Sequence, residues 1–134
     1  MSSTRPDRQA ILQRATEVID IEIEGLKALR DGLGDPYVEL VERCLCTLRD
    51  GGKLVLCGVG KSGHISKKIA ATLSSTGSQA VFLHPVEAMH GDLGMVSSHD
   101  LLLAVSYSGE TDELLAMLPA MKRLGISIAA ITGK

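Results

Sequence analysis

Two turns of the chain, each following an apolar run, carry residues that could bind an anion. The first is GVGKSG, residues 58–63, in which Lys61 and Ser62 lie among glycines. The second is SYSGET, which supplies three hydroxyl groups, from Ser106, Ser108 and Thr111. Backbone N–H groups at the start of a helix bind phosphate oxygens, as hydroxyl donors do, and Lys61 would add a positive charge. Together the two turns favour one small phosphate monoester as the ligand.

The first turn also resembles two nucleotide-binding patterns. A P-loop, G-x-x-x-x-G-K-[ST], needs a glycine where this chain has Val55, so that interpretation fails. A dinucleotide-binding turn, G-x-G-x-x-G, is matched by Gly58, Gly60 and Gly63. The acidic residue that such a domain places after its second strand is missing at residues 83–85. A dinucleotide-binding Rossmann-like domain is therefore kept as an alternative.

Hydrophobic periodicity predicts the elements that must position these turns. Apolar residues at helical spacing predict one helix from Asp7 to about Leu33 and another that starts at Asp35 and ends at residues 50–52. Beyond Gly52, short apolar runs alternate with helical segments, which is typical of a parallel sheet covered on both faces. Residues 84–96 are expected to be irregular. The expected strands are Leu54–Cys57, Ala80–Leu83, Leu101–Val105 and Ile126–Ile131, and the expected helices among them are Ser62–Ser75 and Thr111–Leu124.

Size and composition predict one soluble domain. The chain has 134 residues, of which 45% are hydrophobic and 22% charged, with a formal net charge of -2. This charge gives no general attraction for nucleic acid or an anionic membrane, so neither is an expected partner. No apolar run approaches about eighteen residues, which favours a cytoplasmic protein. The three cysteines, Cys44, Cys46 and Cys57, have no CxxC spacing and are expected to be buried, reduced thiols.

Several segments at these separations resemble a known family. They are GVGKSGHISKKIAATLSSTGS, HPVEAMHGDLGM, SYSGETDEL and ITGK. They are similar to the sugar isomerase (SIS) domain and, more narrowly, to the arabinose 5-phosphate isomerases that supply synthesis of the Kdo sugar of bacterial lipopolysaccharide or capsule. The resemblance implies a flavodoxin-like three-layer α/β sandwich. We expect residues 1–52 to form two helices that pack on the domain, and residues 53–134 to form its N-terminal part.

The family sheet has five strands, whereas the last predicted strand here runs almost to Lys134, so we expect a fragment, incomplete at its C-terminus. The resemblance implies interconversion of arabinose 5-phosphate and ribulose 5-phosphate through an enediolate, without a redox cofactor. A sugar-phosphate-binding module that regulates another protein is the alternative within the same family. The resemblance also implies a homo-oligomer, either a dimer or a tetramer.

The resemblance assigns roles to residues by position. Lys61 would be catalytic by stabilising charge, and Glu113 would be catalytic by transferring the proton. The phosphate would be held by Ser62, Ser106, Ser108 and Thr111. The sugar pocket would be lined by Gly77, Ser78, His84 and His90. His84 is also a candidate ligand for a zinc ion, although its spacing from His90 is not a typical metal motif.

Overall fold

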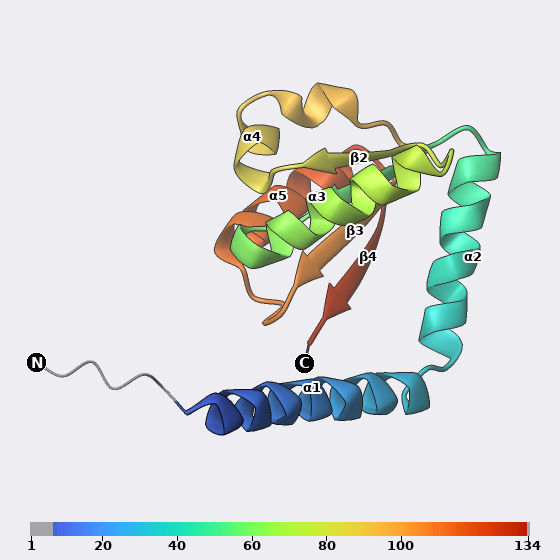
Figure 1. Cartoon of the computed structure of the whole chain (residues 1–134). Helices are drawn as coiled ribbons and strands as arrows, with labels where there is room; N and C mark the ends of the chain where they lie inside the picture. Colours follow the sequence, from blue (N-terminus) through green and yellow to red (C-terminus); the bar gives the residue numbers. More distant parts are fainter. Residues whose placement is uncertain (1–6, 134) are drawn as a thin grey trace, which may run out of the picture. The chain divides into compact units, whose positions relative to one another are not determined.

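The computed structural model describes residues 7–133. The first six residues of the predicted segment 1–52 and the last residue of the predicted segment 53–134, Lys134, lie outside this range. Contacts divide the chain into two compact units, one ending at Val38 and one beginning at Glu39. Figure 1 labels the elements, which in chain order are α1 (Arg8–Asp31), α2 (Asp35–Arg49), β1 (Leu54–Cys57), α3 (Gly60–Ser75), β2 (Ala80–Leu83), α4 (Pro85–Met89), the 3₁₀ helix η1 (Asp92–Met95), β3 (Leu101–Ser106), α5 (Asp112–Arg123) and β4 (Ser127–Thr132).

The long helix α1 makes up most of the first unit. The carboxylate of Asp7 caps its start by accepting a hydrogen bond from the N–H of Gln9 at 3.1 Å, and the helix ends at Gly32. The predicted helix is thus confirmed to within two residues at each end. None of its residues is buried, and its apolar side chains are exposed. Within residues 7–133, no helix is long and apolar enough to cross a membrane.

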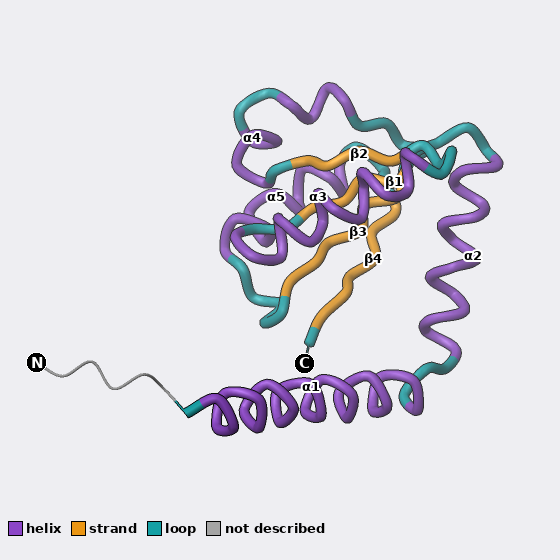
Figure 2. Tube along the Cα trace, viewed as in Figure 1, coloured by secondary structure: helices purple, strands orange, loops and turns teal. Residues whose placement is uncertain are grey.

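The second unit is built on a four-stranded parallel sheet with the strand order β2-β1-β3-β4 (Figure 2). Cys57, at the end of β1, pairs with Leu83 of β2 and with Ala104 of β3. Because all the strands are parallel, their carboxyl ends lie at one edge of the sheet. The turns that follow β1 and β3 therefore leave the same edge from neighbouring strands.

Helices cover both faces of this sheet, as the sequence predicts. On one face, Val55 and Leu102 belong to a buried cluster with Met117 and Met121 of α5 and Ala88 of α4. The other face forms a second cluster that includes Leu54, Leu56, Leu101, Leu103 and Ala70, the last from α3. Neighbouring residues of each strand alternate between the two clusters, as the period of a strand requires. The unit is an α/β three-layer sandwich.

The second half of α2 belongs to this sandwich. Leu40, Cys44 and Leu48 are partly buried and pack against the cluster that contains Leu54 and Leu101. Cys46 is exposed, so the prediction of a buried thiol is wrong at that position. The compact unit therefore begins within α2, earlier than the boundary that the sequence predicts at residue 53.

Residues 84–96, predicted to be irregular, contain two short helices. His84 caps α4, because its Nδ1 accepts a hydrogen bond from the N–H of Val86 at 3.3 Å, and Pro85 occupies the first helical position. A five-residue helix is too short to show a helical period in the sequence, which explains why it was not predicted.

Candidate functional site at the carboxyl edge of the sheet

The turn between β1 and α3 brings the helix unusually close to the strand. A Cβ atom added to Gly63 would lie 2.7 Å from the carbonyl oxygen of Gly58, so only glycine fits there. Gly60 has a positive φ of 56°, a conformation that favours glycine. The buried Ser66 Oγ donates to the carbonyl oxygen of Cys57 at 3.2 Å and holds the helix on β1. These contacts fix the first turn of α3 directly above the end of the strand.

The predicted residues Lys61 and Ser62 occupy this first turn. Lys61 is exposed, and within the described part of the chain its Nζ forms no hydrogen bond or ion pair. Ser62 is half-buried. Val59, at the N-cap position, provides no capping side chain, so the first backbone N–H groups of α3 are available to an anion.

The turn between β3 and α5 is compact and internally hydrogen-bonded. The buried Ser106 places its Oγ 2.9 Å from Thr111 Oγ1 and accepts a hydrogen bond from the N–H of Gly109 at 3.1 Å. Ser108 Oγ accepts from the N–H of Glu110 at 3.1 Å. In the Ser106–Thr111 pair one hydroxyl donates to the other, which leaves one hydroxyl hydrogen for a ligand.

Thr111 is the N-cap residue of α5, yet its hydroxyl does not cap the helix. By contrast, α1 and α4 are capped by the side chains of Asp7 and His84. The two helices that begin at the candidate site thus share a start without a side-chain cap. Glu113 lies in the first turn of α5 and is exposed. Among residues 7–133, no hydrogen bond or ion pair joins it to Lys61.

A pocket of about 230 Å³ lies beside the first of these turns, between α3 and β2. Its lining residues are Gly60, Gly63, His64, Lys67, Phe82 and His84. Of the predicted sugar-pocket residues it contains His84 alone. Sequence reasoning missed His64, Lys67 and Phe82, although His64 and Lys67 are three apart on a helix, and Phe82 lies in β2 two residues before His84, which directly follows the strand. Such spacings place each pair on one face.

The other predicted sugar-pocket residues are separated by the fold. Gly77 and Ser78 lie between α3 and the start of β2, at the opposite edge of the sheet, where Gly77 has a φ of 93° and the N–H of Ser78 donates to the carbonyl oxygen of Leu73. They end α3, and within a single chain they do not reach the carboxyl edge, so their place in the sugar pocket stays a prediction. His90 ends α4 and is exposed.

The zinc ligand that the sequence suggests at His84 stays a prediction. Within the range 7–133, no three His, Cys, Asp or Glu side chains come together in a group that could hold a metal ion. Nδ1 of His84 is already engaged by the N–H of Val86. The structure thus gives no support to a metal ligand at His84, and no chemical step is assigned to a metal here.

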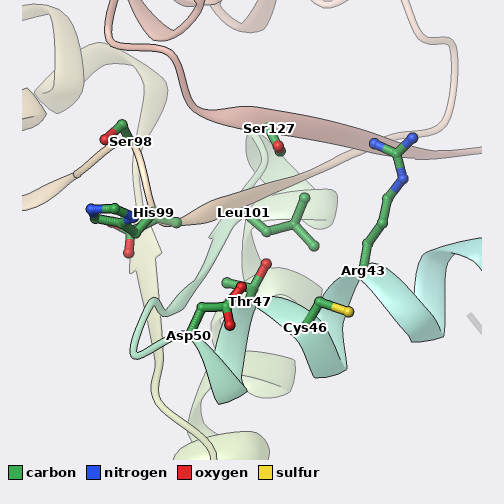
Figure 3. Close-up of a pocket in the computed structure, with 9 residues that line it drawn as sticks. Arg43, Cys46, Thr47, Asp50, Ser98, His99, Leu101 and Ser127 are labelled. Atoms are coloured by element: carbon green, nitrogen blue, oxygen red, sulfur yellow. The ribbon is translucent and has the colours of Figure 1, made fainter.

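Another pocket, of about 290 Å³, lies at the amino ends of β3 and β4 (Figure 3). Arg43, Cys46 and Asp50 of the α2 region face His99 and Ser127 across it. It contains none of the predicted site residues. Ligands of open parallel sheets bind at the carboxyl ends of the strands, so the pocket beside α3 is the better candidate.

The sequence of this chain is similar to those of known proteins. The SIS domain model matches residues 47–134. The arabinose 5-phosphate isomerase KdsD of Pseudomonas aeruginosa is 44% identical over 91% of this chain, and the arabinose 5-phosphate isomerase GutQ of Escherichia coli is 44% identical over 94% of it. These matches cover 36% and 38% of the two relatives, so the chain spans little more than a third of their length.

The solved structure of Escherichia coli CFT073 c3406, a complex with arabinose 5-phosphate, has the same fold. It superimposes with a TM-score of 0.87 and 36% identity, covering 94% of this chain and 65% of that one.

Proposed function

Because the chain belongs to the SIS domain family, we propose that it takes part in the interconversion of arabinose 5-phosphate and ribulose 5-phosphate. One observation supports this most: two turns without side-chain helix caps leave the same sheet edge from the neighbouring strands β1 and β3. One of these turns carries a lysine and the other carries paired hydroxyls. This arrangement suits a single phosphate ester, and both curated relatives described above are named arabinose 5-phosphate isomerases.

We assign the phosphate to the hydroxyl groups. Ser106 and Thr111 offer the remaining hydroxyl hydrogen of their pair, and Ser108 adds a further hydroxyl from the same turn. Ser62 and the open N–H groups of α3 would approach the ligand from the β1 side. A helix N-terminus favours a dianion by about 0.3–1 kcal/mol at an exposed site.

The proton transfer is assigned to Glu113 and the charge stabilisation to Lys61. The carboxylate would take the proton from C2 of the aldose and return it to C1 of the enediolate, while the C2 hydroxyl passes its proton to the C1 oxygen, so that the ketose carbonyl forms at C2. The ammonium group of Lys61, which no described carboxylate neutralises, would stabilise the negative oxygen formed between these two steps. His84 would contact the sugar from the end of β2.

The protein is also proposed to be a homo-oligomer. Leu12, Ile19 and Leu26 recur at seven-residue spacing along α1 and are each more than half exposed, at 59%, 56% and 66%. A seven-residue apolar repeat is typical of helices that pair with another helix. Sedimentation as a monomer at micromolar concentration would contradict this part of the proposal.

A coupled assay and calorimetry together test the function. We expect the purified protein to bind arabinose 5-phosphate and to produce ribulose 5-phosphate. Arabinose without a phosphate is the matched control ligand and should not bind. Binding without turnover would favour the regulatory module, and saturable binding of NAD would favour the dinucleotide-binding alternative. No binding of the sugar phosphate would reject the proposal.

A further inference from the structure

The pocket at the amino ends of β3 and β4 lies at the edge of the sheet opposite to the candidate site. Its volume of about 290 Å³ is close to the lower end of the range for ligand pockets, about 300–1,000 Å³, so it would take one small molecule. Figure 3 shows Arg43 and Asp50 at its two ends, with Cys46 and Thr47 between them. The pocket therefore has a cation at one end and a carboxylate at the other.

Both of these charges are available to a ligand. Within the described part of the chain, neither the guanidinium group of Arg43 nor the carboxylate of Asp50 forms an ion pair or a hydrogen bond. Asp100 also lines the pocket, but the ammonium group of Lys53 lies 2.6 Å from its carboxylate and neutralises it. A ligand that carries one charge of each sign would complement the pocket.

Helical geometry sets the separation of the two charges. Arg43 and Asp50 are seven residues apart, close to two full turns, so their side chains leave the helix on the same side. The helical spacing continues past the end of α2, because the N–H of Asp50 donates to the carbonyl oxygen of Cys46 at 3.0 Å. Seven residues rise by about 10.5 Å, and a charge-assisted hydrogen bond at each end takes about 2.8 Å.

This spacing restricts the ligand. Subtracting two hydrogen bonds from the helical rise leaves about 5 Å between the two charged groups of the ligand. An α-amino acid, whose ammonium and carboxylate groups share one carbon atom, is too short to reach both ends. The charges must therefore lie on opposite sides of a small molecular frame.

Hydroxyl groups line the space between the two charges. Thr47 supplies one from α2, and Ser98 and Ser127 supply two from the facing side of the pocket. Among residues 7–133, none of these three hydroxyl groups has a hydrogen-bond partner. Because a hydroxyl both donates and accepts, the three suit a ligand that carries hydroxyl groups of its own.

We propose that this pocket binds an amino sugar phosphate, with the phosphate on Arg43 and the ammonium group on Asp50. A guanidinium group binds phosphate oxygens through two parallel hydrogen bonds, and a carboxylate accepts hydrogen bonds from an ammonium group. A hexosamine 6-phosphate carries these two charges on opposite sides of one sugar ring, with hydroxyl groups between them. No residue assigned to the proposed function lines this pocket, so the two sites are independent.

Cys46 provides a reporter inside the pocket. Its thiol is exposed and lines the pocket, so a bound ligand should slow its reaction with iodoacetamide. Tandem mass spectrometry would distinguish the label on Cys46 from one on Cys44. The probes are glucosamine 6-phosphate, glucose 6-phosphate, which lacks the amine, and glucosamine, which lacks the phosphate.

The test uses the wild type and three variants, Arg43→Met, Asp50→Asn and Arg49→Met. Arg49→Met is the matched control, because Arg49 is another exposed arginine of α2 and does not line the pocket. All three replaced side chains are exposed, so folding should be preserved, which urea unfolding would verify. Protection of Cys46 is measured in each protein relative to its own rate without ligand.

We expect glucosamine 6-phosphate to protect Cys46 of the wild type in a saturable manner. Glucose 6-phosphate and glucosamine should each need at least about tenfold higher concentrations for the same protection. Arg43→Met and Asp50→Asn should weaken protection by glucosamine 6-phosphate at least about tenfold, and Arg49→Met should match the wild type.

Three outcomes would overturn the proposed amino sugar phosphate site. They are no protection of the wild type, protection by glucose 6-phosphate that equals that by glucosamine 6-phosphate, and an equal loss of protection in Arg43→Met and Arg49→Met. None of them bears on the turnover of arabinose 5-phosphate, which the coupled assay measures separately.

Discussion

Replacing Asp100 by asparagine should destabilise the sandwich strongly. Asp100 is only 3% exposed, and its carboxylate accepts three hydrogen bonds at the amino ends of β1 and β3. Oδ1 accepts from the N–H of Lys53 at 3.0 Å, and Oδ2 accepts from Lys53 Nζ at 2.6 Å and from the N–H of Ser97 at 2.7 Å. Asn keeps the size of the side chain but loses the charge, and its amide group presents hydrogens where one oxygen now accepts two bonds.

The size of the effect follows from these contacts. Hydrogen bonds to a charged group contribute about 1.5–3 kcal/mol each, and removing one partner of a buried ion pair costs about 3–5 kcal/mol. The side chain of Lys53 is 25% exposed and can turn toward water, which reduces the cost. We therefore expect a loss of about 2–3 kcal/mol in the free energy of unfolding. In a unit of this size that lowers Tm by roughly 10–20 °C.

The assay is urea unfolding of the wild type, Asp100→Asn and Asp50→Asn, followed by circular dichroism. Asp50 is exposed and serves as the control, with an expected change within about 0.5 kcal/mol. A change of that small size for Asp100→Asn would refute the reasoning, because it would mean that the three hydrogen bonds do not contribute to stability.

The pH dependence gives a second readout. Burial raises the pKa of Asp100, but the hydrogen bonds from Lys53 and Ser97 and the charge of Lys53 outweigh it, so the pKa lies below its ordinary value of 3.8. A carboxylate whose pKa is lower in the folded state than in the unfolded state stabilises the fold at pH values above its unfolded-state pKa. This stabilisation is lost as the pH falls through its folded-state pKa. The difference in the free energy of unfolding between the wild type and Asp100→Asn should therefore be largest near neutral pH. It should become smaller in acid, below about pH 4.

Further changes test the site and the thiols. Gly63→Ala should cost about 1–3 kcal/mol in unfolding experiments, because its Cβ would meet the carbonyl oxygen of Gly58 at 2.7 Å; unchanged stability would mean that the turn can relax. Lys61→Ala should abolish turnover in the coupled assay while leaving the unfolding curve unchanged, since the side chain is exposed, and undiminished activity would remove it from the mechanism. Of Cys46 and Cys57, the exposed Cys46 should react first with a disulfide reagent, because burial raises the pKa of Cys57 to about 12; equal rates would contradict the buried position.

The sheet was predictable because its strands are continuous apolar runs. Leu54–Cys57 and Ala80–Leu83 coincide with the predicted strands, since each is an unbroken apolar run with no polar residue inside it. Both anion-type turns were also predictable, since strand, glycine and helix follow each other directly in the sequence. The short α4 was missed because it is too short to show a helical period, and its cap by the ring nitrogen of His84 is a role that residue type alone does not indicate.

The composition of the pocket was harder to predict. Gly77 and Ser78 belong to a segment that resembles the family as strongly as the turns do, but α3 runs back along the sheet and leaves them at its far edge. Lys67 and Phe82 are common helix and strand residues, and only the packing of α3 against the edge strand β2 shows that they meet. Residue spacing within one element cannot predict which side chains of two distant elements come into contact.

Both helices that begin at the site lack a capping side chain of their own, and this has a consequence for their motion. Until an anion arrives, the first N–H groups of α3 and α5 must be hydrated, and the opening turns should exchange their amide hydrogens faster than the turns behind them. A bound phosphate would complete both helices at once. Ligand protection should therefore appear first, and most strongly, at two places far apart in the sequence, near residues 60–62 and 112–114.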